Sequence, residues 1–182
     1  MKALRSLAVL CLVASLTVSA KQVEKAPAPA KGFHAEFVAN LDDVQSKIVA
    51  LAEATPAEKF EWRPESDVRS ISEVYMHIAG GNYFLPTFTG FKAPSNLDRD
   101  MEKNVTAKAA VVAELKKSFE HLRAAAAAVN EADLEKPVKM FGNQTTTRGV
   151  LVTALSHLHE HLGQSIAYAR MNKITPPWSS AP

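Results

Sequence analysis

The chain has 182 residues, of which 47% are hydrophobic and 22% are charged, and this composition suits one globular domain. A domain of this length can bury a substantial core, so it needs neither disulfides nor a metal ion for folding. The formal net charge of +2 gives no reason to expect nucleic acid or acidic lipid as a partner. Apolar residues recur mainly at helical spacing, which indicates an all-α protein.

The N-terminal segment has the parts of a secretory signal peptide, which we expect over residues 1–20. Lys2 and Arg5 form a short positive region, and an uncharged run and the small residues Val18-Ser19-Ala20 follow. The run is shorter than the roughly 20 apolar residues that cross a bilayer, so a membrane-spanning helix is the weaker interpretation. We therefore expect an exported mature chain, periplasmic or secreted, that makes no contact with a membrane.

Cys11 is the only cysteine, and it lies within the expected signal peptide. The mature chain would have no thiol, which excludes disulfides, iron–sulfur ligation, thiolate zinc sites and a cysteine nucleophile. Any metal ion must then be held by histidine and carboxylate side chains.

Residues 21–31 form a charged Ala-Pro linker, and the folded domain is expected over residues 32–178. The first long helix begins near Phe33, because apolar residues recur along one of its faces. That face comprises Phe33, Phe37, Leu41, Val44, Ile48 and Leu51. The sequence Thr55-Pro56-Ala57-Glu58 has the pattern of a capping box and predicts a short helical turn. We expect Trp62, which follows it, to cover the end of the domain.

The second helix begins between Val68 and Ser70, and its apolar positions are Ile71, Val74, Tyr75 and Ile78. Gly80-Gly81 weakens this helix and Pro86 ends or disturbs it. Residues 84–100 form a loop punctuated by proline and glycine. The aromatic residues of this loop predict that it packs against the domain.

The third helix has a heptad-like stripe, with Thr106 as its expected N-cap. The stripe comprises Val112, Leu115, Phe119, Leu122, Ala126 and Val129. Residues 139–144 form an extended or turn segment, and Thr145 to Thr147 offer N-caps for the last helix. That helix runs to about Met171, because Pro176-Pro177 prevents further extension. Four long helices with one long crossover connection make a four-helix bundle.

The fourth helix carries the strongest chemical signal, since His157 and His161 are four residues apart. Side chains at this spacing lie on one helix face, so the two imidazoles can share one metal ion. They flank the buried stripe, which comprises Leu151, Ala154, Leu155, Leu158, Leu162 and Ile166. His159 lies on the opposite flank and is not counted as a ligand. Such pairs also occur on solvated faces, so the pair alone does not establish a site.

His77 on the second helix supplies a third imidazole at the inner flank of an apolar stripe. Alone, such a histidine is usually a residue of the core edge, bonded to a carbonyl or to water. Three histidines from two helices instead predict one divalent metal ion held by His77, His157 and His161. Three neutral imidazoles with one position left for water form the open geometry of catalytic zinc sites.

Weaker candidates surround this trio. Gln164 could orient a ligand histidine, Tyr168 could position a substrate, and Glu73 could be a ligand or a general base. The alternatives are a surface glutamine, a tyrosine at the edge of the bundle and a solvated carboxylate in a first helical turn. His34 could line the mouth of the site, and we expect His121 to face solvent. No catalytic residue is assigned.

Several motifs, taken in order, resemble the DinB-like family of four-helix bundles, which are regarded as metalloenzymes. They are Trp62-Arg63-Pro64, Ser70-Ile71-Ser72-Glu73, His77-Ile78-Ala79, Gly142 to Thr147, His157-x-x-x-His161-x-x-Gln164 and Ile174-Thr175-Pro176-Pro177. The resemblance spans about residues 33–177. Each motif is loose alone, but their order and spacing together are specific.

The resemblance implies a bundle that is not a simple up-and-down meander, consistent with the long connection at 84–100. It also implies a divalent ion, usually zinc or nickel, on the positions that map onto His77, His157 and His161. Some relatives are transferases or isomerases that use a small cytosolic thiol, but export would separate this chain from that thiol. DinB-like bundles often pair, so a homodimer is a further expectation.

Three functions fit these observations. The first is a metal-dependent hydrolase or transferase of unknown small-molecule substrate, in which the ion polarises a carbonyl or activates water or a thiol. The second, ranked close behind, is a non-catalytic exported protein that binds a metal or a small ligand. The third is a haem-binding bundle with Met and His axial ligands. No Cys-x-x-Cys-His attachment motif is present, and two histidines one turn apart suit a small ion better than haem.

Overall fold

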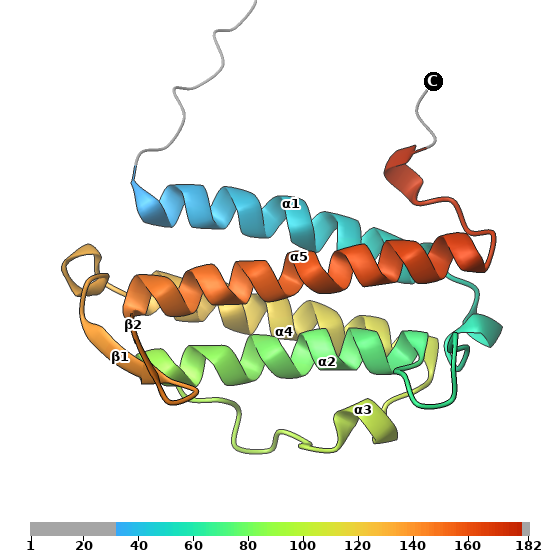
Figure 1. The fold of residues 1–182 in the computed structure, drawn as a ribbon, viewed down its shortest axis with the longest axis horizontal. Coiled ribbons are helices and arrows are strands. Elements are labelled where there is room, and N and C mark those ends of the chain that lie inside the picture. Colours follow the sequence, from blue (N-terminus) through green and yellow to red (C-terminus); the bar gives the residue numbers. More distant parts are fainter. Residues whose placement is uncertain (1–31, 180–182) are drawn as a thin grey trace, which may run out of the picture.

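The computed structural model describes residues 32–179 (Figure 1). The expected signal peptide and linker therefore lie outside the described residues. Four long helices dominate the described chain: α1 (Phe33–Ala54), α2 (Ile71–Phe84), α4 (Lys108–Ala128) and α5 (Thr147–Met171). Their arrangement confirms the all-α four-helix bundle. No helix between residues 32 and 179 is both long enough and apolar enough to cross a membrane.

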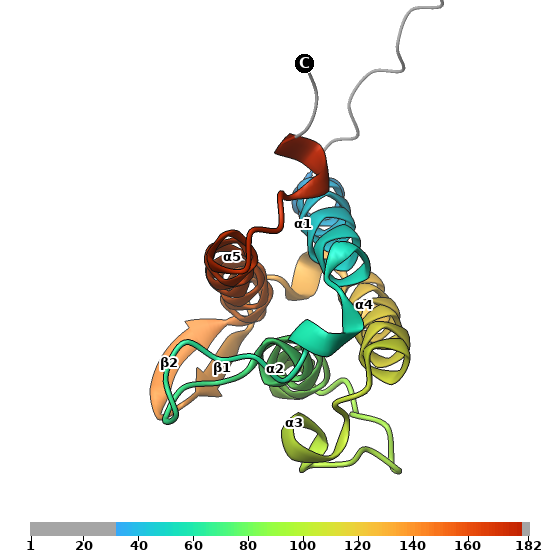
Figure 2. The same cartoon turned by 90° about the vertical axis from the view of Figure 1, so that its right-hand side faces the viewer.

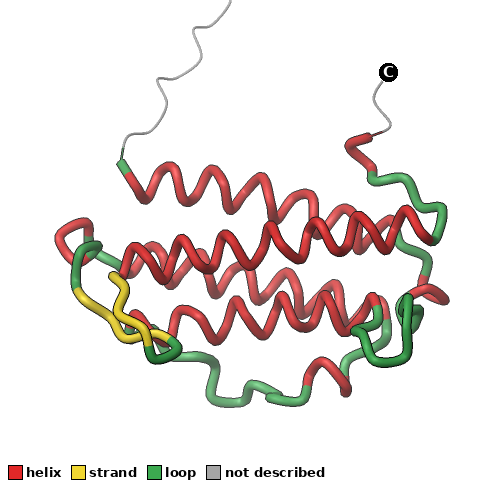
Figure 3. Tube along the Cα trace, viewed as in Figure 1, coloured by secondary structure: helices red, strands yellow, loops and turns green. Residues whose placement is uncertain are grey.

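Short elements join the long helices, and one follows the last of them (Figure 3). They are the 3-10 turns η1 (Ala57–Lys59), η2 (Leu85–Thr89), η3 (Glu131–Asp133) and η4 (Pro177–Ser179), the helix α3 (Met101–Asn104), and the strands β1 (Pro137–Met140) and β2 (Asn143–Thr146). The two strands pair antiparallel, with Met140 opposite Asn143. The segment predicted as extended or turn is thus a hairpin closed by two residues, Phe141 and Gly142.

The helices are ordered so that α1 and α2 occupy opposite corners of the bundle (Figure 2). Both pack against α4 and α5, which fill the other two corners. Helices α2 and α4 run in the same direction, so residues 85–107 must return along the whole length of the bundle (Figure 1). This is the predicted long crossover, and it carries η2 and the unpredicted helix α3.

The apolar stripes of the long helices meet in one core. Along α1, Phe37, Leu41, Val44, Ile48 and Leu51 are all buried, as their spacing predicts, whereas Phe33 at the helix start is only partly covered. On α4, Leu115, Phe119, Leu122 and Ala126 are buried as predicted. Val112 and Val129 are only partly buried, while Val111, Ser118 and Ala125 are buried instead. Since α4 packs against both α1 and α2, its buried face is wider than one heptad stripe.

Two predicted helix caps are wrong. Helix α4 begins after Ala107, and no side chain caps it, so Thr106 does not have that role. The hydroxyl of Thr55 donates to the carbonyl of Leu51 instead of capping η1. Thr55 is buried at the end of α1, where a backward hydrogen bond satisfies its hydroxyl. The predicted N-cap of α5 is confirmed, because Thr146 accepts a hydrogen bond from the amide of Gly149.

Candidate metal centre

Three histidines converge between α2 and α5. His77 comes from α2, and His157 and His161 lie one turn apart on α5. Each offers one ring nitrogen, and these three atoms all lie within 4.8 Å of one another. The ring centroids are 4.5 to 5.1 Å apart. Three ring nitrogens grouped this closely could hold one metal ion.

The helices that carry these histidines are fixed at their starts by side chains. Ser70 and Glu73 form a reciprocal capping box at the start of α2, with the Ser70 amide donating to Glu73 Oε2 at 2.7 Å. Ile78 on α2 and Leu158 on α5 are fully buried beside the histidines. Capping sets where each helix begins and burial sets which face turns inward, so the three imidazoles are brought to the same position.

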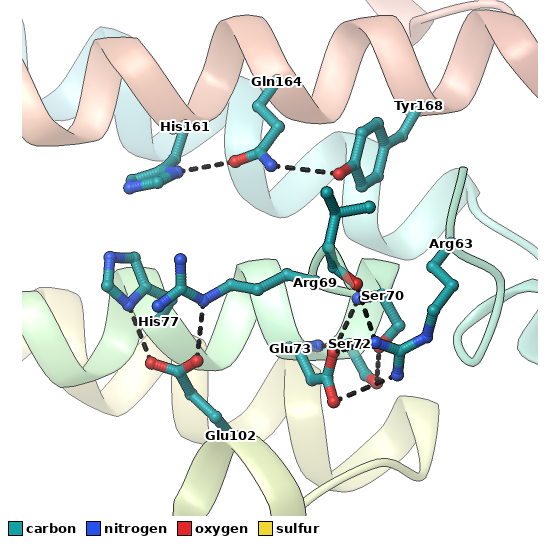
Figure 4. A network of polar contacts seen from close by, with 11 residues as sticks. Arg63, Arg69, Ser70, Ser72, Glu73, His77, Glu102, His161, Gln164 and Tyr168 are labelled. Atoms are coloured by element: carbon teal, nitrogen blue, oxygen red, sulfur yellow. Dashed lines mark hydrogen bonds and ion pairs between the residues drawn. The ribbon is translucent and has the colours of Figure 1, made fainter. Parts of the chain in front are cut away.

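A carboxylate holds the His77 ring in place (Figure 4). Nδ1 of His77 lies 2.7 Å from Oε1 of Glu102, which is on the short helix α3. The other oxygen of Glu102 accepts a 2.7 Å hydrogen bond from Nε of Arg69. A carboxylate can only accept, so in the neutral ring of His77 Nδ1 carries the proton and Nε2 presents its lone pair.

A second chain of hydrogen bonds fixes His161 (Figure 4). Its Nδ1 lies 2.8 Å from Oε1 of Gln164, whose amide nitrogen donates to the hydroxyl of Tyr168 at 3.1 Å. Tyr168 is itself held by an edge-on contact with Trp62. Because the amide oxygen accepts, Nδ1 of His161 is the donor and Nε2 is left for a ligand. Bonds of this type orient metal-binding imidazoles and raise their basicity.

His157 is positioned by packing. Its ring lies against the backbone of Gly81 on α2, so that a Cβ at Gly81 would come within 2.4 Å of Cε1. Nδ1 of His157 is buried without a hydrogen-bond partner among the described residues. The site therefore requires glycine at position 81, because the absence of a Cβ there leaves room for the imidazole between the helices.

The electrostatics of the site keep its α5 imidazoles neutral. Burial, together with the neighbouring His161, His77 and Arg69, lowers the pKa of His157 to about 4. Burial also lowers the pKa of His161, partly opposed by its hydrogen bond to Gln164. Only the neutral ring can bind a metal, so both side chains are in their ligand form at neutral pH.

A pocket of about 480 Å³ opens beside the histidines. His77 and His157 line one part of it, and Phe84, Leu85 and Phe141 line another. Glu160, exposed on α5, also lines the pocket. Its carboxylate makes no hydrogen bond or ion pair to any other described residue.

Glu73, the remaining predicted site residue, has a different set of partners. Glu73 accepts hydrogen bonds from Ser70 and pairs with Arg63, so its carboxylate belongs to a helix cap and an ion pair and is not part of the three-histidine cluster. Its spacing from Ser70 is the signature of a helix cap, and that local signal takes precedence. Burial, the largest single influence, raises the pKa of Glu73. The hydrogen bonds to Ser70 and the contacts with Arg63 together outweigh it, so the net pKa is lowered.

Two other histidines have structural positions. His34 contacts Glu131 through Nδ1 at 2.8 Å and does not line the pocket. His121 does not face solvent as predicted; it is half-buried between the rings of Tyr83 and Phe91, at 5.0 Å from each. Burial accordingly lowers the pKa of His121. The loop that supplies Phe91 packs down on α4, and this contact covers the imidazole.

Glu102 and Gly81 are site residues that the sequence did not reveal. Glu102 lies 25 positions from His77 and on a helix of four residues, too short for periodicity to place it. Gly81 did leave a signal, because a glycine inside a helix often marks a close approach. Tyr168, a predicted substrate-positioning residue, instead contacts Gln164 from a buried position.

Comparisons with known proteins identify the family and the fold. The model of the DinB superfamily matches residues 40–165. A DinB-like protein of Bacillus cereus is 17% identical, with a TM-score of 0.68 over 78% of this chain and 93% of that one. A DinB-like protein of Bacillus subtilis is 21% identical, with a TM-score of 0.62 over 77% and 93%. A conserved protein of Enterococcus faecalis is 14% identical, with a TM-score of 0.65 over 78% and 97%. No curated protein matches the chain significantly.

Proposed function

Since the chain belongs to the DinB superfamily, we propose that it binds one divalent metal ion, zinc or nickel, through His77, His157 and His161. The observation that carries this proposal is the pair of hydrogen bonds to Glu102 and Gln164. They leave Nε2 of two imidazoles unprotonated and directed away from these partners. Nitrogen donors of this kind suit zinc and nickel, whereas calcium and magnesium prefer oxygen.

We further propose that the site serves a metal-dependent hydrolase or transferase. A bound ion would polarise a carbonyl or lower the pKa of a bound water or thiol. The chain's own residues would hold the ion with three histidines and leave room for a ligand, since the pocket reaches His77 and His157. Glu160 lines the same pocket and is the best placed carboxylate to accept a proton from a ligand there.

A non-catalytic metal or ligand carrier is the second candidate. One observation favours it: Glu73 and Glu102 are both occupied by hydrogen bonds and by ion pairs with arginine, so neither is available as a base. Hydrolysable esters and amides separate the two functions. An enzyme turns some of them over only when metal is bound and loses turnover in Glu160→Gln, whereas a carrier shows no metal-dependent turnover.

The metal site itself is tested by the metal content of tag-free protein, measured by elemental mass spectrometry. The wild type should carry close to one zinc or nickel ion per chain, and His161→Ala should carry none. His159→Ala is the matched control, because His159 is exposed on the same helix and lies outside the trio. A wild type that neither carries metal nor takes it up from dilute zinc would refute the site.

We also propose that the mature chain is exported. The support is the charged start, the apolar run and the small residues of the first 20 positions. Export fits a chain whose only cysteine would be removed with that segment. The metal would then be acquired outside the cytoplasm, and a substrate would be an extracytoplasmic compound.

A further inference from the structure

We propose that the pocket beside the three histidines receives an apolar, ring-sized group of the ligand, while the polar head of the same ligand reaches the metal. The placement of the head rests on the proposed function; the apolar subsite stands on its own residues. The ligand is thus a small amphipathic molecule with a metal-binding donor at one end and an aromatic or branched alkyl group at the other.

The first argument is a cluster of aromatic rings on the wall of the pocket. Phe84 at the end of α2 is 50% exposed, and Phe141 at the tip of the hairpin is 62% exposed. Their rings are 6.1 Å apart, and Phe88 of η2 packs edge-on against both, at 5.3 and 5.2 Å. Exposed apolar groups gathered at a pocket mark a binding surface more often than single exposed residues do.

The second argument is the backbone at Phe141. The two turn residues have positive φ, 51° at Phe141 and 85° at Gly142, which is the pattern of a type I′ hairpin turn. Asparagine or glycine is favoured at the first position, and a bulky side chain there is a strained outlier. The chain therefore places a phenylalanine over the pocket at a position where turn chemistry alone would select a polar residue.

The third argument is the distance between the apolar wall and the histidines. Phe84 follows His77 by seven residues of the same helix, which is about 10 Å along the helix axis. Phe84 and His77 both line the same pocket of about 480 Å³. That volume lies in the ordinary range for sites that bind small molecules. One ligand can therefore contact the metal site and the phenylalanine rings together.

The experiment compares propanohydroxamate with 3-phenylpropanohydroxamate, which share a metal-binding head and differ by one ring. Binding to the cobalt-loaded protein is read from the change in the visible absorption of cobalt. The ring should strengthen binding at least about fivefold in the wild type. In Phe141→Asn this preference should fall toward unity while propanohydroxamate binds as before. Met171→Gln is the control, because Met171 is 61% exposed and lies outside the pocket.

The Asn variant also guards against misfolding, since asparagine is favoured at this turn position and should keep the hairpin stable, as thermal unfolding will show. A wild type with no preference for the ring, or an Asn variant that retains it, would overturn the inference. Failure of cobalt binding would refute the proposed metal site instead. The subsite is then judged with a neutral dye, N-phenyl-1-naphthylamine, in metal-free protein: fluorescence enhancement lost in Phe141→Asn supports it, and no enhancement overturns it.

Discussion

Replacing Gly81 with alanine should abolish tight metal binding although it replaces none of the three metal ligands. The new Cβ would lie 2.4 Å from Cε1 and 2.8 Å from Nδ1 of His157. To reach an ordinary contact of about 3.4 Å the ring must move by about 1 Å, whereas metal–ligand distances tolerate only about 0.2 Å. The imidazole cannot keep its place, so the ion loses one of three nitrogens. Since changes that merely loosen a ligand cost about 10- to 100-fold in affinity, we expect a loss on the order of 100-fold.

The matched control is Gly163→Ala, on the helix that carries His157 and His161. Nothing lies within 4 Å of a Cβ at Gly163, which is exposed to solvent. Alanine is a better helix former than glycine, so this variant should gain up to about 1 kcal/mol of stability and bind metal as the wild type does. Gly81→Ala has the same gain in helix propensity, but the clash with His157 offsets it.

Zinc affinity is measured by competition with a chromophoric chelator, and the free energy of unfolding of the metal-free proteins by urea titration. We expect Gly163→Ala to bind zinc as tightly as the wild type and to be more stable than it. We expect Gly81→Ala to bind zinc far more weakly than either. Equal zinc affinity in Gly81→Ala and Gly163→Ala would refute the claim that packing of His157 on α2 shapes the site.

Three further predictions concern the metal centre and the export of the chain. Glu102→Gln should weaken zinc binding by about tenfold or more, because it removes the charge that orients His77. Glu73→Gln is the control: it only loosens a helix cap and should leave the zinc affinity unchanged in the same titration. Because the folded pKa of His157 is about 4, below the ordinary 6.5, the unfolded chain binds more protons between these values. Metal-free protein should therefore lose stability as the pH falls from about 6.5 to 4, and urea titrations of His157→Gln should show a weaker pH dependence. Amino-terminal sequencing of protein recovered from the extracytoplasmic fraction should begin near Lys21; a chain that retains Met1 would contradict export.

The histidine trio was accessible from the sequence because each ligand sits on a long helix. In a helix of 14 or 25 residues, the apolar stripe fixes which flank faces inward, and the positions of His77, His157 and Gln164 follow from that. The same reasoning placed the buried face of α1 correctly. It also set His159 apart, and the structure leaves that side chain exposed.

The supporting residues were not accessible in this way. Glu102 lies on a four-residue helix in the crossover, where no periodicity exists to orient a side chain. Glu73 was left open between a ligand or base and a carboxylate of the first helical turn, although Ser70 three residues earlier already marked it as a cap. His121 was misread because its burial comes from Phe91, which lies in a loop thirty positions away. Long-range contacts decided all of these outcomes except Glu73.

The crossover connects the topology of the bundle to the chemistry of the site. Because α2 and α4 run in the same direction, the chain must travel back along the bundle after α2, and it does so beside α2 (Figure 1). A short hairpin between antiparallel helices would give the same core but would carry no segment past His77. The return path lets α3 present Glu102 to His77 and Arg69 at 2.7 Å from each. The long connection therefore completes the metal centre that α2 and α5 form, and its length is a requirement of the site as well as of the fold.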